Sequence, residues 1–280
     1  PFSKALRMNA RIPLAPSPAT WLQRPGLAGG IDQDGGRAAE LLGHGFGSVE
    51  FGSVTAQPLP GHNVGVAALV QALKNALAAA PQSAPQGRAP CAVGIGLGVP
   101  AAVALEHVAA QWLAGFAAAA EVAHYVSLNL SARAHQRLLE PAGLAVLGAA
   151  FVAVATLRDQ THQLGREGQH GAVRLAIKLP GTHPGASTAA ALALAAGIDQ
   201  LTVVLPDTGE RWACLSALRQ QVGAGPDLVA VGGIRCRADV DRARACGASG
   251  VQVHRLFTAQ GAQCLQGLIQ PTCSDGDADS

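Results

Sequence analysis

The sequence predicts an α/β fold, a single (β/α)8 TIM barrel, from three observations. Short apolar runs followed by glycine-rich or polar corners occur eight times between Gly26 and His254. Ala- and Leu-rich stretches, long enough for crossover helices, lie between these runs. Most of the runs are continuously apolar rather than alternating, which is typical of strands buried on both faces of a parallel sheet. Eight such units in a chain of 280 residues suit one closed barrel.

The predicted strands are spread evenly along the chain. The first three carry glycines within the run, whereas the later ones are built mainly from Val, Leu and Ile. Parallel neighbours need a crossover connection of about a dozen residues or more, and the gaps between the runs provide it. The eight runs cover residues 26–31, 48–55, 91–98, 125–130, 173–179, 201–205, 228–234 and 250–254.

The remainder of the chain predicts one domain with irregular ends. Residues 1–25 contain several prolines and are expected to form an irregular N-terminal lead-in, followed by the barrel over residues 26–270. Residues 271–280 are acidic and are expected to be a disordered tail. The apolar run Leu144–Leu157 is too short to span a bilayer and is interpreted as a buried helix, so we expect no membrane span.

Composition narrows the class of protein further. A hydrophobic content of 49% allows a large core, and a formal net charge of +2 with scattered basic residues predicts no nucleic-acid surface. The six cysteines form no CxxC pair and no cluster with histidines. We therefore expect free thiols in a reducing cytoplasm and no metal site. The many apolar helix residues would allow a homodimer.

Several strand ends carry motifs in a fixed order. Residues 26–35 read GLAGGIDQDG, residues 43–55 read GHGFGSVEFGSVT, and VGGI at 231–234 is followed by GASGVQV at 247–253. These segments resemble the motifs GLAAGxDKDG, GxGFGxxExGTVT and GVGGI…AGASxVQ of dihydroorotate dehydrogenase, the FMN-containing barrel enzyme of pyrimidine synthesis. The resemblance is collinear from about residue 26 to 261 and is nearest to the membrane-associated branch, class 2 of that family.

The resemblance implies an FMN site at the carboxyl ends of the strands. The residues that stand in family order at these corners are Ala28, Gly29, Ser53, Asn129, Lys178, Gly232 and Gly233. Small residues let the backbone approach a flat ring, and a lysine beside a flavin stabilises the negative charge that develops on reduction. Paired glycines after the seventh strand stand where barrels bind phosphate, and His254 or Arg255 would add a charged contact to it.

Each of these residues also has a purely structural interpretation. Lys178 would then be a barrel-core lysine paired with a carboxylate such as Asp32 or Glu50. Asn129 would only cap the helix that follows its strand. Small residues such as those at positions 28 and 29 also occur at the corners of barrels that bind nothing.

The residues that hold the substrate in the family are largely replaced. The serine that removes a proton from dihydroorotate corresponds to Ala132, and the asparagine that holds the substrate ring corresponds to Ala134. Gln33 stands in place of the lysine that binds the substrate carboxylate, and Leu205 replaces an asparagine after the sixth strand. Loss of a general base typically lowers the rate by about 10²–10⁴-fold, so we do not expect dihydroorotate itself to be oxidised.

No catalytic residue is assigned from the sequence. Arg133, His135, His62 and His183 all lie in loops on the predicted catalytic face, and a histidine there titrates near neutrality and can move protons. An arginine does so poorly, because its guanidinium stays protonated.

Two functions are therefore carried forward. The first is an FMN-dependent oxidoreductase that acts on a CH–CH or C=N bond of a small heterocycle. The alternative is a non-catalytic barrel that serves as an accessory or binding protein in a biosynthetic pathway, with its upper face filled by side chains such as Leu97, Leu205 and Leu256. A third interpretation, an aldolase or isomerase with Lys178 as Schiff base, draws only on the shared architecture.

Overall fold

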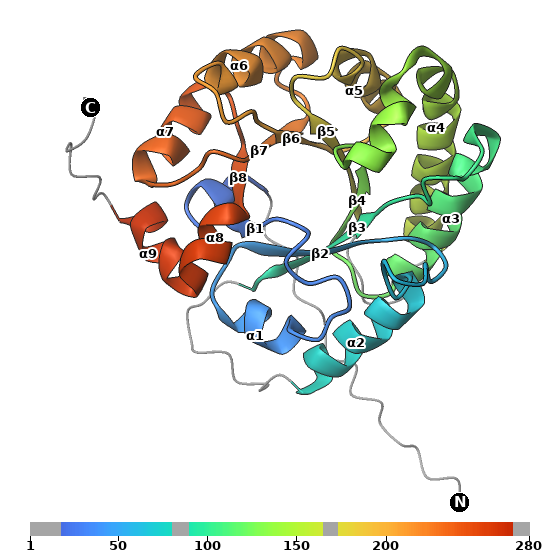
Figure 1. The fold of residues 1–280 in the computed structure, drawn as a ribbon, viewed down its shortest axis with the longest axis horizontal. Helices are drawn as coiled ribbons and strands as arrows, with labels where there is room; N and C mark the ends of the chain where they lie inside the picture. The colour runs from blue at the N-terminus through green and yellow to red at the C-terminus, as the bar shows by residue number, and fades with distance from the viewer. Residues whose placement is uncertain (1–17, 80–89, 165–172, 271–280) are drawn as a thin grey trace, which may run out of the picture.

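Eight parallel strands close into a barrel in the order in which they occur along the chain. The structure is a computed structural model that describes residues 18–79, 90–164 and 173–270. Figure 1 looks down the barrel and shows the strands as an inner ring with helices around it. The predicted (β/α)8 fold is confirmed.

Every predicted strand is present, with shifted ends. β1 is much shorter than predicted because the chain turns directly after Leu27: the carboxylate of Asp32 accepts from the backbone N–H groups of Asp34 and Gly35. Pairing of Gly26 with Gln252 closes the ring. The strands are β1 (Gly26–Leu27), β2 (Ser48–Val54), β3 (Ala92–Leu97), β4 (Tyr125–Asn129), β5 (Arg174–Pro180), β6 (Gln200–Val204), β7 (Asp227–Val231) and β8 (Gly250–Val253).

The helices lie on the outside of the barrel, each covering the strands with its apolar face. The α-helices are α1 (Ala38–Gly43), α2 (Val66–Ala79), α3 (Val108–Ala119), α4 (Pro141–Leu164), α5 (Ala186–Ala195), α6 (Arg211–Val222), α7 (Arg237–Ala245), α8 (Arg255–Gln260) and α9 (Cys264–Ile269). Short 3-10 helices are η1 (Pro18–Leu22), η2 (Leu105–His107), η3 (Arg133–Leu139) and η5 (Gly261–Gln263).

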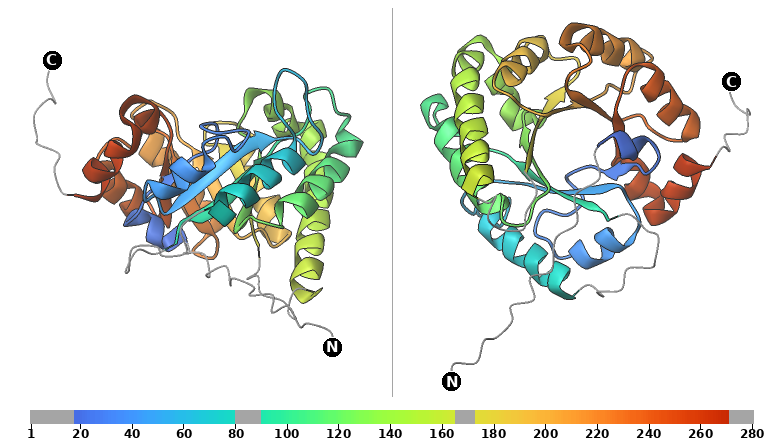
Figure 2. Two further views of the ribbon diagram at one scale, coloured as in Figure 1. Left: turned by 90° about the horizontal axis from the view of Figure 1, so that it is seen from below. Right: turned by 180° about the vertical axis from the view of Figure 1, so that it is seen from behind.

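Helix α4 is longer than its apolar run predicted, and Figure 2 shows it along the side of the barrel. The helix continues past Leu157 because the Arg158 guanidinium binds the carbonyl of Gly197 and the carboxylate of Asp199, both at 2.9 Å. By length and composition alone, its stretch Pro141–Gln163 would be able to cross a membrane. This evidence is weak, because 33% of its most apolar window is buried in the barrel and core helices meet the same criteria.

The described part of the predicted N-terminal lead-in closes the lower end of the barrel, which is the end where the strands begin. Residues 1–17 and the predicted tail 271–280 lie outside the described residues. Trp21 in η1 is only 1% exposed, and its ring centroid lies 5.5 Å from that of Tyr125 in β4. With the lower end filled by aromatic rings, the space for a ligand is at the opposite end, where strands lead into the βα loops.

Candidate functional site

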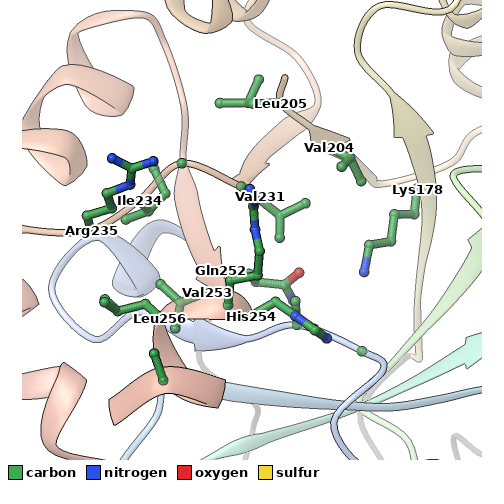
Figure 3. Close-up of a pocket in the computed structure, with 16 residues that line it drawn as sticks. Lys178, Val204, Leu205, Val231, Ile234, Arg235, Gln252, Val253, His254 and Leu256 are labelled. Carbon is green, nitrogen blue, oxygen red and sulfur yellow. The ribbon is translucent and has the colours of Figure 1, made fainter. Parts of the chain in front are cut away.

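A cavity of about 580 Å³ opens at the carboxyl ends of β1 and β5 to β8. This volume lies within the range of about 300–1,000 Å³ that is common for small-molecule sites. Figure 3 shows the lining side chains, with Lys178 entering from β5 toward the side chains of Gln252 and His254. Leu205 and Leu256 line the cavity without filling it, and Leu97 packs toward Gly115 of α3 instead.

Seven of the nine residues predicted for a cofactor site line this one cavity. They are Ala28, Gly29, Lys178, Gly232, Gly233, His254 and Arg255. They come from β1, β5, β7 and β8 or the turns that follow, so the closed barrel brings together residues that are far apart in the sequence. The structure does not bring Ser53 and Asn129 to this cavity.

Gly232 and Gly233 give the cavity a wall of bare backbone. Both have positive φ angles, +99° and +68°, which L-residues with a side chain adopt only under strain. A Cβ at Gly232 would lie 3.0 Å from the carbonyl oxygen of Leu205, and one at Gly233 would lie 2.9 Å from a guanidinium nitrogen of Arg211. Any other residue at these two positions would place a Cβ against neighbouring atoms, so only glycine keeps this part of the wall as bare backbone.

The described lining is cationic. It includes Lys178, Arg235 and Arg255 and no carboxylate. The exposed Arg255 makes a bidentate ion pair with Asp207, which follows β6, and the hydrogen bonds from this arginine lower the pKa of the Asp207 carboxyl. The chemistry of this lining suits an anionic group such as a phosphate.

Lys178 lines the cavity and is also paired inside the barrel. Its ammonium lies 3.2 Å from Glu50 Oε1, and the two side chains are 8% and 1% exposed. Asp32 instead holds the turn after β1, so of the two carboxylates considered from the sequence it is Glu50 that contacts the lysine. Lys178 is therefore both a barrel-core lysine paired with a carboxylate and a residue of the cavity lining.

Ser53 and Asn129 bind each other beside the cavity. The Asn129 side-chain amide donates to Ser53 Oγ at 2.7 Å, while Asn129 Oδ1 accepts from the backbone N–H of Ser131 at 2.9 Å and from its hydroxyl at 2.8 Å. Asn129 thus caps the turn at Ser131 directly after β4, and not the helix that the structural interpretation from the sequence named.

His254 is the histidine that lines the cavity among those in the described part of the chain. His254 also borders a second cavity of about 530 Å³, between α1 and α8. Its side chain therefore separates the two cavities. Partial burial, and then the positive charges of Lys178 and Arg255, lower the pKa of His254. The ring is therefore biased toward its neutral, proton-accepting form.

None of the loop residues considered as a base lines the cavity. His135 is buried, its Nε2 lies 3.0 Å from the Val99 carbonyl oxygen, and burial lowers its pKa. His183 lies 3.4 Å from Glu140, whereas Arg133 and His62 are exposed. Burial of His135 was not expected, because the sequence placed it in an exposed loop. It holds η3 to the loop after β3.

Two polar lining residues were missed by the sequence analysis. Gln252 is fully buried; its Nε2 donates to Tyr125 Oη at 3.0 Å, and its Oε1 has no partner among the described residues. A glutamine between Val251 and Val253 of a buried strand was the available signal, because the barrel interior alternates with its exterior. Arg235 follows the paired glycines, and a charge beside such a turn was the corresponding signal.

The fold and the site define a barrel with an anion-suited, cation-lined cavity at the carboxyl ends of its strands. No group of three metal-ligating side chains occurs within residues 18–79, 90–164 and 173–270. Such a cavity is the usual location of the ligand in a (β/α)8 enzyme.

Comparison with known proteins specifies the relatives. The chain is 26% identical over 288 residues to dihydroorotate dehydrogenase (quinone) of Arthrobacter sp. (strain FB24), covering 84% of this chain and 77% of that protein. The corresponding enzymes of Thiobacillus denitrificans (27% identity; 88% and 83% covered) and Burkholderia ambifaria (26%; 95% and 88%) are similar to it as well. No family model matches the sequence.

Solved structures agree on the fold. Dihydroorotate dehydrogenase of Eimeria tenella in complex with ferulenol superposes with a TM-score of 0.72 at 18% identity, covering 87% of this chain and 78% of that one. Its ligand-free form gives 0.70 at 17% identity, with 93% and 88% covered. The predicted resemblance is confirmed: the chain is similar to dihydroorotate dehydrogenases in sequence, at 26–27% identity over most of its length, and in fold.

Proposed function

We propose that the protein is an FMN-dependent oxidoreductase of the dihydroorotate dehydrogenase type, acting on a CH–CH or C=N bond of a small heterocycle other than dihydroorotate. The observation that carries the proposal is the convergence of Lys178, the paired glycines 232 and 233, His254 and Arg255 on one cavity at the strand ends. Homology to dihydroorotate dehydrogenases over most of the chain supports the reaction class.

The residues present fit FMN. Ala28, Gly29 and the paired glycines offer close backbone approach on two sides of the cavity, and Arg235 and Arg255 provide charge for a phosphate. The buried Oε1 of Gln252 has no partner among the described residues and would accept a hydrogen bond from a ring N–H. When bound, FMN supplies the capacity to accept a hydride from a carbon or nitrogen centre.

The side chains of the cavity have distinct roles in such a reaction. Lys178 holds a fixed positive charge at the wall, where low dielectric strengthens its effect on developing negative charge. His254, biased toward its neutral form, accepts the proton that leaves the substrate. Gly232 and Gly233 with Arg235 bind the phosphate and thereby orient the ring.

The proposed substrate differs from dihydroorotate because the positions that hold dihydroorotate in the family carry no matching groups in this chain. Ala132, where the family has its base, has no proton acceptor, and Leu205 presents a buried aliphatic side chain to the cavity. Gln33 is exposed and borders a separate, smaller cavity after β2. Burial of a neutral polar group without a hydrogen-bond partner costs on the order of 2–7 kcal/mol, and burial of a charged carboxylate without donors costs more.

The test is anaerobic reduction of the FMN-loaded protein by candidate substrates, followed through loss of the visible flavin absorption. We expect dihydroorotate to reduce the flavin at least about 10²-fold more slowly than one or more members of a panel of dihydro-heterocycles without a carboxylate. Rapid reduction by dihydroorotate would contradict the substrate assignment. His254→Gln should slow reduction by the preferred compound while the flavin stays bound.

A second function, a non-catalytic accessory barrel, is favoured by one set of contacts. Lys178 with Glu50, Ser53 with Asn129 and His135 with the loop after β3 are all partnered within the protein. Polar groups that are already satisfied need no ligand. If the flavin binds but no compound in the panel reduces it, this alternative replaces the enzymatic one.

A further inference from the structure

Four buried polar side chains meet inside the barrel directly below the cavity. Lys178 Nζ lies 3.2 Å from Glu50 Oε1, Tyr125 Oη lies 3.4 Å from Glu50 Oε2, and Gln252 Nε2 donates to Tyr125 Oη at 3.0 Å. They project from β5, β2, β4 and β8, so the contacts cross the interior of the barrel. Lys178 and Gln252 also line the cavity, so a ligand bound in the cavity would contact two of the four side chains.

The carboxylate of Glu50 occupies space that two glycines leave open. A Cβ at Gly29 would lie 2.8 Å from Glu50 Oε1, and a Cβ at Gly96 would lie 3.5 Å from the same atom. Gly29 is itself part of the cavity wall. The carboxylate therefore lies immediately behind the wall on which a flat ring would rest, and beside the lysine that faces that ring.

Tyr125 adds a hydroxyl to this arrangement but no charge. Burial, and then the negative charge of Glu50, raise the pKa of Tyr125 well above its usual value, so the phenol stays protonated. It can then donate to Glu50 Oε2 while accepting from Gln252. Glu50 is the carboxylate that contacts Lys178 in the described part of the chain.

We propose that Glu50 is a positioning residue that fixes the ammonium of Lys178 at the cavity wall and offsets part of its charge, and thereby lowers the reduction potential of a flavin bound there. The inference rests on the proposed function. Reduction adds negative charge to the flavin, and a lysine stabilises that charge. A carboxylate 3.2 Å from the lysine opposes this stabilisation, strongly so in a buried site where screening by water is weak.

The experiment measures the potential of bound FMN by equilibration with a reference dye in wild-type protein and in Glu50→Gln, which keeps the shape and removes the charge. We expect the affinity for reduced FMN, relative to oxidised FMN, to rise about tenfold, which for a two-electron couple is an upward shift of about 30 mV. Lys178→Met should shift the potential in the opposite direction. Glu121→Gln, an exposed carboxylate on the outside of the barrel, is the matched control and should leave the potential unchanged.

Glu50→Gln leaves the buried lysine unpaired, so a second variant covers loss of folding. Glu50→Asp keeps the ion pair but draws the carboxylate back, and it should raise the potential in the same direction by a smaller amount. If FMN binds to all of these proteins and both Glu50 variants keep the wild-type potential, the inference is overturned while the proposed function stands. If wild-type protein takes up no FMN, the proposed function itself fails.

Discussion

The side-chain amide of Asn129 at the end of β4 donates to the hydroxyl of Ser53 at the end of β2, with 2.7 Å between Nδ2 and Oγ. The contact joins two strands across the intervening β3 and uses polar atoms that the resemblance assigned to the cofactor. Asn129 also caps the turn at Ser131, so its side-chain oxygen and amide are both engaged within the protein.

Replacement of Asn129 should therefore affect stability more than flavin binding. Asn129→Ala removes a cap and a hydrogen bond, and we expect the free energy of unfolding to fall by about 1–2 kcal/mol. FMN affinity should change less than about threefold, or about 0.7 kcal/mol, because the Asn129 amide contacts Ser53 and Ser131 rather than the cavity. Urea denaturation and fluorescence titration measure the two, with exposed Asn75→Ala of α2 as control. A large loss of FMN affinity at unchanged stability would show that Asn129 contacts the flavin.

Gly232→Ala should weaken FMN binding as well as stability. A side chain at φ +99° costs about 1–2 kcal/mol, and this Cβ would also press on the Leu205 carbonyl oxygen at 3.0 Å. Gly223→Ala, at φ +69° with nothing within 4 Å of its Cβ, provides the same kind of backbone strain away from the cavity. We expect both variants to lose stability, Gly232→Ala more than Gly223→Ala, but a loss of FMN affinity only at position 232. Equal FMN affinities in the two variants would remove the paired glycines from the phosphate site.

Asp207→Asn should strengthen binding of anions. Asp207 pairs with Arg255 at the cavity mouth, and loss of its charge leaves that guanidinium available to a phosphate. We expect FMN and inorganic phosphate to bind roughly threefold more tightly at low salt, with the difference declining as salt is added. Isothermal titration at two salt concentrations measures it, and Asp241→Asn in α7 is the matched exposed control. Unchanged phosphate affinity would mean that Arg255 does not reach the anion.

Stability should fall as the pH is lowered from about 7.5 to 5.5. Burial lowers the pKa values of His135 and His254 in the folded chain, so below the ordinary histidine value of about 6.5 the unfolded chain binds more protons. Stability is therefore fully present above that value and is lost on acidification. Urea denaturation across this range measures the slope, which His135→Gln should reduce and exposed His107→Gln should not. A flat profile would contradict the burial of these rings.

The sequence predicted the barrel well because strand burial and crossover length are local properties. Lys178, Gly232 and Gly233, predicted for a cofactor site, all line the cavity, because strand ends in a closed barrel meet at one mouth. Asp32 and Glu50 were suggested from the sequence as examples of a carboxylate partner for Lys178, and the register around the barrel places Glu50 beside it. Burial of His135 could not be predicted, because it depends on how two loops pack together.

The central claim is that this cavity binds FMN, and the most direct measurement is the visible spectrum of the purified protein before and after incubation with FMN and removal of the excess. We predict a flavin spectrum with about one FMN per chain, and weaker retention in Lys178→Met and Gly232→Ala. A colourless wild-type protein that also retains no added FMN would contradict the account.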